Sequence, residues 1–227
     1  MIDAEGGPPS GHRRRARVGG RRASAFALGL LAGLCAASAA SADPGFRRAT
    51  TPSGWADFCK RETGSCAHYN RIATPPELTA EKRAELERVN REVNRSITYV
   101  TDQKYLGVEE FWSYPIDGKG DCEDMALLKR KKLQELGWPR SSLLMTVVVA
   151  YNGEWHAVLT VETDQGYLVL DNMTDAILPP EQTRHRFFSS QSRETPNRWV
   201  MWSNREVAGR TDHRPEGSPA SAPAKTP

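Results

Sequence analysis

Residues 118–128 read GKGDCEDMALL, a glycine-containing loop that leads directly into a helix. Asp121 opens this helix, and the apolar side chains that follow it recur at helical spacing. Gly137 and Pro139 are typical signals after a helix C-terminus, so the helix is expected to end before them. The side chains expected to face a core are Met125, Ala126, Leu128 and Leu133.

The sequence after this helix is rich in strand-forming residues. Residues 143–151, LLMTVVVAY, predict one strand. Residues 156–161 and 167–172, HAVLTV and YLVLDN, predict a hairpin, because two apolar runs flank a short polar turn. The aromatic stretch 184–202 is expected to close the sheet.

A second helix is predicted before the cysteine-containing loop. A Ser/Thr-x-x-Glu capping pattern from Thr74 to Glu77, with two early prolines, marks its expected start. Apolar residues at helical spacing then continue for about five turns. These apolar residues are Leu86, Val89, Val93 and Ile97.

The composition suits one compact domain with tails, since 38% of the 227 residues are apolar and 26% are charged. Residues 1–42 combine an arginine-rich start with a short apolar stretch and a small-residue end, which predicts an export signal cleaved after Ala42. An uncleaved membrane anchor is the less favoured interpretation. Residues 43–54 predict an extended arm, residues 55–204 the folded domain, and residues 205–227 a disordered tail.

The net charge gives no sign of a nucleic-acid partner. The formal charge is +3, but residues 1–42 contribute six arginines against two acidic residues. The mature chain therefore carries 25 basic and 26 acidic residues. Such a near-neutral chain lacks the basic surface that nucleic-acid binding requires.

Three cysteines remain after the predicted cleavage, namely Cys59, Cys66 and Cys122. An exported protein meets an oxidising compartment, which favours a disulfide between Cys59 and Cys66 across a short polar loop. A zinc site that adds His68 to these two is a weaker alternative, because paired C-x-x-C spacing is absent. Cys122 is then the odd thiol, which is either an intermolecular disulfide partner or a reactive group.

Cys122 lies where a thiol is readily activated. A helix N-terminus lowers a thiol pKa, because unpaired backbone N–H groups and the helix dipole favour the thiolate. The N–H of Cys122 itself can serve as one donor of an oxyanion hole. A buried structural cysteine is the alternative, but an apolar site does not suit a thiol flanked by three acidic residues. These neighbours are Asp121, Glu123 and Asp124.

The three flanking carboxylates oppose thiolate formation, because nearby negative charge raises the pKa of a thiol. A hard cation held by oxygen ligands would neutralise them, and Ca²⁺ accepts several carboxylates in flexible geometry. A solvated acidic first turn that only complements the helix dipole explains the residues equally well. The residues alone leave both interpretations open.

One histidine stands out as a candidate base. His156 begins a strand of apolar residues, so it can share a sheet face with a partner on the next strand. His68 falls in the expected disulfide region and His185 in a charged segment. Neither of these two is assigned a role.

The predicted hairpin supplies a partner for this histidine. Pairing Val161 with Gly166 around a four-residue loop places His156 opposite Asp171. Opposed residues share a face, with Cβ atoms about 5 Å apart, so a carboxylate can bind the imidazole and fix its tautomer. A thiol at a helix start together with such a pair is typical of acyl-transfer enzymes.

Four stretches together resemble the bacterial transglutaminase-like cysteine proteinases, whose best-understood members are periplasmic LapG-type proteases that cleave biofilm adhesins. The stretches occur in the family's order, and the resemblance covers residues 55 to about 202. GDCED is the most specific of them. The stretches are Trp112–Pro115, Gly120–Asp124, His156–Leu159 and Leu170–Asn172.

The resemblance implies an α+β fold of the papain/transglutaminase type, with the nucleophile helix packed on an antiparallel sheet. It also implies a Cys-His-Asp triad and bound calcium, which makes the cation the favoured interpretation of the acidic residues. The implied triad is Cys122, His156 and Asp171, and the implied calcium ligands are Asp121, Glu123 and Asp124.

The implied activity is hydrolysis of peptide bonds in a periplasmic or cell-surface protein such as a biofilm adhesin. The resemblance also suggests an inner-membrane receptor that sequesters the enzyme. Two alternatives stay open: a protein-glutamine transamidase of the same fold, and a catalytically silent binding module, which the intact GDCED stretch argues against. The expected location is the periplasm or the cell exterior, with neither nucleic acid nor stable membrane insertion involved.

Overall fold

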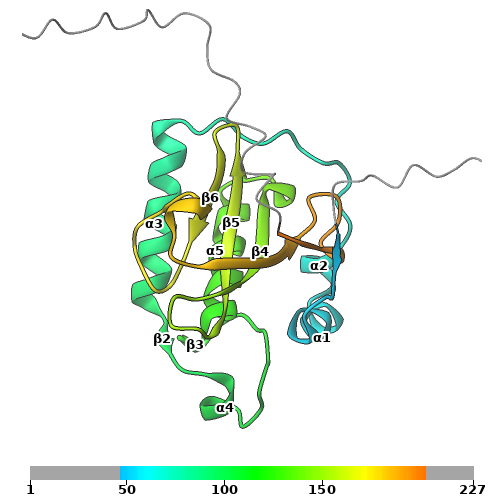
Figure 1. Cartoon of the computed structure of the whole chain (residues 1–227), viewed down its shortest axis with the longest axis vertical. Coiled ribbons are helices and arrows are strands. Elements are labelled where there is room, and N and C mark those ends of the chain that lie inside the picture. The colour runs from blue at the N-terminus through cyan, green and yellow to red at the C-terminus, as the bar shows by residue number, and fades with distance from the viewer. Residues whose placement is uncertain (1–46, 203–227) are drawn as a thin grey trace, which may run out of the picture. The chain divides into compact units, whose positions relative to one another are not determined.

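The computed structural model describes residues 47–202, so the predicted signal (1–42) and the predicted tail (205–227) lie outside the described residues. A six-stranded antiparallel sheet in the order β1-β8-β7-β4-β5-β6 forms the centre of this part (Figure 1). The strands are β1 (Arg48–Ala49), β4 (Leu143–Val149), β5 (Trp155–Thr163), β6 (Gly166–Leu170), β7 (Arg186–Gln191) and β8 (Trp199–Met201).

This sheet confirms the predicted strand at 143–151, the predicted hairpin and the closure of the sheet by the aromatic stretch. Within the predicted arm (43–54), Arg48–Ala49 is extended and pairs with β8 as strand β1, while residues 43–46 lie outside the described residues. The predicted end of the arm is wrong, because Ser53 already belongs to the first helix.

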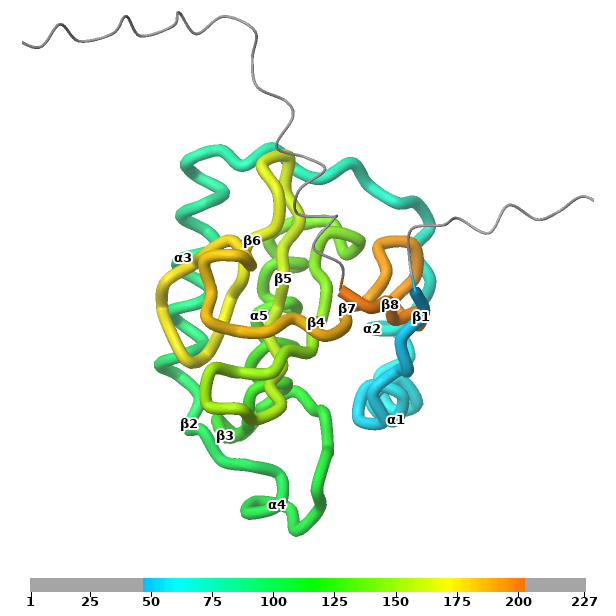
Figure 2. The backbone as a smooth tube through the Cα atoms, viewed as in Figure 1, coloured from blue at the N-terminus to red at the C-terminus, as the bar shows by residue number. Residues whose placement is uncertain are grey.

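The helix that carries Cys122, α5 (Cys122–Glu135), packs against β4 and β5, and α3 (Ala80–Ser96) packs against α5. In Figure 2, α5 lies behind the strands and α3 lies to their left. Asp121 is the N-cap of α5, and Gly137 has a φ of 87°, the left-handed conformation that follows many helix ends. The predicted helix on the antiparallel sheet and the α+β class are therefore confirmed.

The remaining elements are short, and two of them form a second sheet next to the start of α5. β2 pairs in parallel with β3, which brings residue 99 beside Gly120. These strands are β2 (Thr98–Tyr99) and β3 (Lys119–Gly120). The helical segments, of which Figure 1 labels the α-helices, are α1 (Ser53–Arg61), α2 (Thr63–Cys66), α4 (Asp102–Tyr105), η1 (Arg140–Ser142) and η2 (Pro180–Gln182).

The predicted start of α3 is wrong. Thr79, not Thr74, is its N-cap, and the Thr79 side chain accepts a hydrogen bond from the N–H of Lys82. The chain before Thr79 is tied instead to the turn between β5 and β6. There the N–H of Leu78 donates to Asp164 Oδ1, and the N–H of Asp164 donates to the carbonyl of Pro76. These contacts hold the proline segment extended, which prevents an earlier helix start.

The predicted hairpin register is wrong by two residues. Thr163 pairs with Gly166, so the turn has two residues, and Val161 pairs with Leu168 instead of Gly166. The turn consists of Asp164 and Gln165, and Gly166, at a φ of 105°, follows it as the first residue of β6. Because side chains alternate between faces with a period of two, this slip keeps each residue on its predicted face.

One apolar core lies between the sheet and the helices. α3 contributes Leu86, Val89 and Val93, which are all buried, and the facing strands contribute Leu159 and Leu170. At the other end, the indole rings of three buried tryptophans pack edge to face, with centroids 6.0–6.3 Å apart. These tryptophans are Trp55, Trp112 and Trp199. The core thus fixes α5 and β5 relative to each other.

The predicted disulfide is confirmed. Cys59 and Cys66 are joined by an S–S bond of 2.02 Å that connects α1 to α2. Because both sulfurs are bonded to each other, the alternative zinc site with His68 is excluded for this state of the protein. Among residues 47–202, no helix has both the length and the apolar character needed to span a membrane.

Gly54 in α1 lies against the tryptophan cluster, and this contact generates a stability prediction. A Cβ at this position would lie 2.2 Å from Trp112 Cδ1. Gly54→Ala is therefore expected to lower the free energy of unfolding by about 1–3 kcal/mol, measured by urea denaturation. Gly64→Ala is the matched control, because nothing lies within 4 Å of its added Cβ. Equal stabilities of the two variants would contradict the packing argument.

Candidate active site

Cys122 is the first residue of α5, directly after the short strand β3. Gly120 in β3 has no room for a side chain, because a Cβ there would lie 2.7 Å from Asp124 Oδ2. The glycine before the cysteine therefore lets the chain pass close to the first turn of the helix. The thiol is partly buried and faces β5, where the N–H of Ala157 donates to Cys122 Sγ at 3.4 Å.

The thiol is held in its protonated form by its surroundings. Cys122 Sγ donates a hydrogen bond to Glu123 Oε2 at 3.0 Å. Burial, followed by the negative charge of Glu123, raises the pKa of Cys122 well above its usual range. The Ala157 N–H acts in the opposite direction but is outweighed. A thiolate at this position therefore needs further positive charge nearby.

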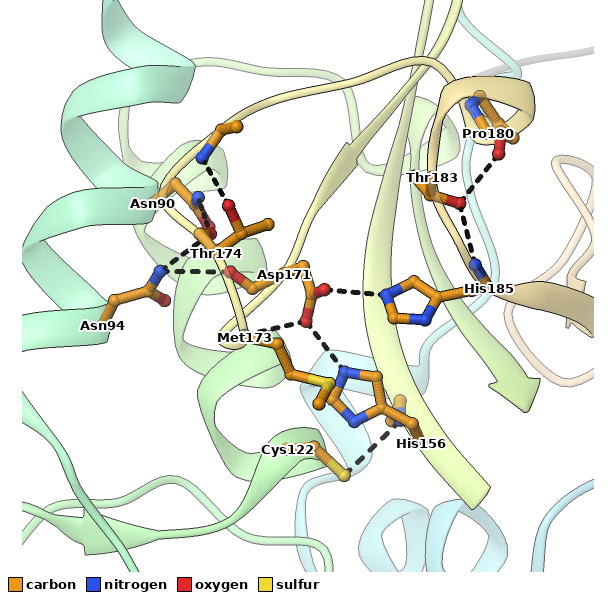
Figure 3. Close-up of polar contacts among 12 residues, drawn as sticks. Asn90, Asn94, Cys122, His156, Asp171, Met173, Thr174, Pro180, Thr183 and His185 are labelled. Atoms are coloured by element: carbon orange, nitrogen blue, oxygen red, sulfur yellow. Dashed lines mark hydrogen bonds and ion pairs between the residues drawn. The ribbon is translucent and has the colours of Figure 1, made fainter. Parts of the chain in front are cut away.

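His156 on β5 and Asp171, directly after β6, form a buried pair. His156 Nε2 lies 2.8 Å from Asp171 Oδ1, and both side chains are less than a tenth exposed. They meet although they are not directly opposed, because the two-residue slip leaves both on the same face of the sheet. Figure 3 shows the ring of His156 between the carboxylate of Asp171 and the thiol of Cys122.

The hydrogen bond to Asp171 fixes the tautomer of His156. A carboxylate only accepts hydrogen bonds, so the ring proton must lie on Nε2. Nδ1 is then left without a proton and is free to accept one. Burial opposes the charge of Asp171, but the hydrogen bonds from His156 and His185 outweigh it and hold the pKa of Asp171 below its usual range.

His185, which the sequence analysis set aside, contacts the same carboxylate. Its Nε2 lies 2.9 Å from Asp171 Oδ2, and its side chain is buried. His185 precedes β7, two strands away from β5 in the sheet order, so no local pattern in the sequence connects it to Asp171. Only the tertiary fold brings the two histidines to one carboxylate.

The backbone around Asp171 is tied to α3. Asn94 Nδ2 donates to the carbonyl of Asp171 at 3.0 Å and to that of Thr174 at 3.2 Å. Asn90 Nδ2 also donates to Thr174, at 3.1 Å. These bonds hold the loop after β6 against the helix, so the position of the Asp171 carboxylate does not depend on β6 alone.

A cluster of three buried carboxylates lies on the other side of Cys122. The three residues are Asp102, Asp121 and Glu123, and each has one carboxylate oxygen within 4.8 Å of those of the other two. Asp121 Oδ2 accepts the N–H of Asp102 at 3.1 Å, whereas Asp121 Oδ1 is buried and has no hydrogen-bond partner among residues 47–202. Asp102 was not predicted as a site residue, because no motif marks it and it lies 20 residues before the cysteine in a four-residue helix.

Asp124 lies outside this group of three. Its Oδ1 accepts the N–H of Ser113 at 2.6 Å, which ties the Trp112 loop to α5. The structure therefore brings together two of the predicted calcium ligands, Asp121 and Glu123, and adds Asp102 in place of Asp124. Carboxylate oxygens are the ligands that Ca²⁺ prefers, so the donor set and the unpaired Asp121 Oδ1 both fit a bound cation.

The charges of these carboxylates repel one another in a buried setting. Burial, followed by Asp121, raises the pKa of Glu123 to about 9. Burial and Asp121 likewise raise the pKa of Asp102 to about 6, and burial raises that of Asp124 to about 7, with Asp121 and Asp102 adding to the effect. Without a positive charge, the cluster therefore favours bound protons.

A hollow of about 360 Å³ opens at the thiol. Its lining includes Cys122, His156 and Asn172, together with the exposed rings of Tyr99 and Trp155. Tyr99 reaches this place because β2 pairs with β3 directly before the cysteine. The aromatic rim can pack against apolar parts of a bound chain.

Comparison with known proteins gives one family and a set of similar structures. The sequence profile of the bacterial transglutaminase-like cysteine proteinases, BTLCP, matches residues 46–207. A search of curated proteins gave no match. Calcium-bound LapG of Legionella pneumophila is similar at 28% identity over 48% of this chain and 64% of that one, with a TM-score of 0.43. LapG of that organism is 26% identical over 57% of this chain and 75% of that one, with a TM-score of 0.45. EGTA-treated LapG is 26% identical over 54% of this chain and 68% of that one, with a TM-score of 0.46.

The raised carboxylate pKa values predict how stability depends on pH in a chelating buffer. A group whose pKa is raised on folding stabilises the protein below its unfolded pKa, and this contribution is lost as pH rises through the folded pKa. For Asp102 and Asp124 the loss falls between about pH 4 and pH 7. The melting temperature in EGTA is therefore expected to fall from pH 5 to pH 7.

Two features sharpen this measurement. Lys129 is buried, and its pKa is lowered to about 7. Its effect on the stability of the fold therefore changes only above about pH 7, where a rise in pH increases stability. The window from pH 5 to pH 7 therefore isolates the carboxylates. Asp102→Asn is expected to reduce the slope of melting temperature against pH, and an unchanged slope would contradict the assigned repulsion.

Proposed function

The chain belongs to the bacterial transglutaminase-like cysteine proteinases, and on that premise we propose that it is an exported cysteine endopeptidase with a Cys-His-Asp triad. In this proposal Cys122 is the nucleophile, His156 the general base and acid, and Asp171 the residue that orients the base. The observation that carries it is the buried 2.8 Å pair of His156 and Asp171 beside a free thiol at a helix start.

The tautomer of His156 defines the first step. Because Nε2 keeps its proton for Asp171, Nδ1 accepts the proton of the Cys122 thiol. The resulting imidazolium is stabilised by the Asp171 carboxylate, and the thiolate attacks the carbonyl carbon of the scissile peptide bond. The N–H of Cys122, at the first position of α5, is a suitable donor to the oxyanion that develops.

The same histidine completes the reaction. Its Nδ1 proton passes to the leaving amine as the C–N bond breaks, which leaves a thioester on Cys122. A water molecule then gives a proton back to His156 and attacks the thioester. The acid product leaves, and the thiol regains its proton. Hydrolysis needs no other reactant, so the chemistry is complete with the three side chains and water.

We further propose that a calcium ion is held by Asp102, Asp121 and Glu123. When bound, the cation supplies positive charge that neutralises these carboxylates beside the thiol. The buried and unpaired Asp121 Oδ1 supports this assignment, since it would otherwise remain an unsatisfied charged group. Asp124 then acts by fixing the Ser113 backbone next to the site.

The proposed substrate is a periplasmic or cell-surface protein such as a biofilm adhesin. Support comes from the family, from the predicted export signal and from the hollow at Cys122, whose exposed Tyr99 and Trp155 suit an extended protein chain. Control by an inner-membrane receptor belongs to the same proposal. The alternative, transamidation in the same fold, differs only in whether an amine or water resolves the thioester.

Cys122→Ala and His156→Ala are expected to abolish cleavage and leave the fold intact. Asp171→Asn keeps much of the geometry but disturbs the tautomer, so its loss should be smaller than that of Cys122→Ala. The measurement is the appearance of new N-termini when the purified mature chain is incubated with surface proteins of the organism that encodes it. Unchanged cleavage by Cys122→Ala would refute the triad.

Circular dichroism of each variant controls for folding in this assay. A parallel reaction with a labelled primary amine separates the two chemistries, because a hydrolase yields new termini whereas a transamidase incorporates the amine. His68→Ala is the matched histidine control, since His68 is exposed and its ring contacts only the Thr195 hydroxyl among the described side chains.

Calcium is expected to raise the melting temperature relative to EGTA, and to raise it more at pH 7.5 than at pH 5. Protons and the cation compete for the same carboxylates, which gives the pH effect its direction. A stabilisation of about 2.7 kcal/mol is expected at a calcium concentration of 100 times Kd. Differential scanning fluorimetry measures it, and magnesium should act more weakly because it demands stricter geometry.

Variants assign this calcium effect to the cluster. Asp121→Asn is expected to remove most of the calcium-dependent shift, because it takes away the carboxylate charge at the centre of the cluster. Glu109→Gln, which changes an exposed acidic residue of the neighbouring loop, should leave the shift intact. Equal shifts in wild type and Asp121→Asn would contradict the proposed site.

A further inference from the structure

We propose that His185 is a positioning residue whose Nε2–H holds Asp171 Oδ2, so that Oδ1 is presented to His156. This inference rests on the proposed function, because it assigns His185 a task within the proposed triad. It extends the three-residue arrangement by a fourth side chain that does not touch the reacting atoms. Figure 3 shows Asp171 between the two imidazole rings.

The two oxygens of Asp171 have different partners. Oδ1 accepts His156 Nε2 at 2.8 Å and the N–H of Met173 at 3.0 Å. For Oδ2, His185 Nε2 at 2.9 Å is the hydrogen-bond partner found in the described part of the chain. Removal of His185 would therefore leave a buried carboxylate oxygen unpaired, and the carboxylate could then rotate away from His156.

Besides its bond to Asp171, His185 is held in place by its ring and by its backbone. Its ring stacks on that of Tyr151, with centroids 6.2 Å apart and an interplanar angle of 18°. Its backbone N–H donates to Thr183 Oγ1, and that hydroxyl donates to the carbonyl of Pro180 at 2.8 Å. A side chain whose only task was to fill space would not need its ring nitrogen aimed at a carboxylate.

The hydrogen bond to Asp171 also fixes the tautomer of His185. Asp171 can only accept, so the proton of the neutral ring lies on Nε2. Nδ1 is buried and, within residues 47–202, has no hydrogen-bond partner, so a proton there would be unsatisfied. His185 therefore acts as a neutral donor, which leaves the negative charge of Asp171 available to the imidazolium of His156.

The ligand atoms of His156, Asp171 and His185 also lie within 4.8 Å of one another, a spacing compatible with a metal ion. The hydrogen bonds of 2.8 and 2.9 Å already account for this closeness. Each ring nitrogen that faces the carboxylate is engaged as a donor. The geometry therefore points to shared hydrogen bonds at Asp171 and gives His185 a role through them.

The test measures the rate at which iodoacetamide alkylates Cys122, followed by mass spectrometry of the peptide that contains it, in calcium-containing buffer. His185→Ala is expected to slow alkylation about tenfold, within the usual range of couplings between contacting residues. His185→Gln should restore much of the rate, because its Nε2 can donate to Oδ2 without an imidazole ring. His68→Ala should alkylate at the wild-type rate.

A double-mutant cycle separates positioning from packing. If His185 acts through Asp171, His185→Ala has no further effect on alkylation in an Asp171→Ala background. Equal slowing in both backgrounds, or a His185→Gln rate as slow as that of His185→Ala, would overturn the inference. Melting temperatures of all variants identify any loss that comes from unfolding.

Nitrogen-15 NMR of the histidine rings gives a readout that needs no reaction. The expected signature is protonated Nε2 and unprotonated Nδ1 for both His156 and His185, with the His156 signals shifted in His185→Ala. A protonated Nδ1 on neutral His185 would overturn the proposal. These outcomes are distinct from failure of the proposed function, which is decided by cleavage with Cys122→Ala.

Discussion

The buried carboxylate of Asp171 is the constraint on which the arrangement of the site depends. A charged group that is 3% exposed requires donors from its surroundings, and here they come from β5, from the loop after β6 and from the residue before β7. α3 fixes the backbone of the same residue through Asn94. Four separate elements must therefore be correctly packed before this one side chain is satisfied.

Two groups of charged residues flank the thiol, and they are built on opposite principles. Asp171 is surrounded by donors, which lower its pKa and keep it charged. Asp102, Asp121 and Glu123 accept few hydrogen bonds and lie close to one another. Burial and mutual repulsion therefore raise the pKa values of Asp102 and Glu123. The first group satisfies its charge within the fold, whereas the second favours protons unless a cation is supplied.

The nucleophile helix and the disulfide could be predicted from local signals in periodicity, capping or spacing, whereas the fold class was implied by the resemblance to the family. The prediction that His156 and Asp171 lie on the same face followed from the alternation of side chains along a hairpin. The predicted register was wrong by two residues, but side chains alternate with a period of two, so the face was still correct. The start of α3 did not follow, since the extended segment before Thr79 is set by contacts with Asp164, which is far away in the sequence.

Asp102 and His185 could not be found in the same way. Each reaches its partners through the packing of elements that are separated along the chain, and neither lies in a motif. The roles of Cys122, His156 and Asp171 stay predictions that the proposed variants test. The part of the site that could be inferred from the sequence is therefore the part that lies on two neighbouring strands and at the start of one helix.

The contacts of the thiol indicate where control over reactivity lies. The proposed base, His156, has its partner in place, because its Nε2 donates to the charged Asp171 carboxylate. The thiol is held in its protonated form, because it donates to Glu123 and burial raises its pKa. A cation that draws the Glu123 carboxylate into its own coordination would remove both the hydrogen bond and the adjacent negative charge. In the proposed mechanism, thiolate formation therefore depends on both groups: the histidine pair provides the acceptor for the thiol proton, and the acidic cluster opposes the charge that results.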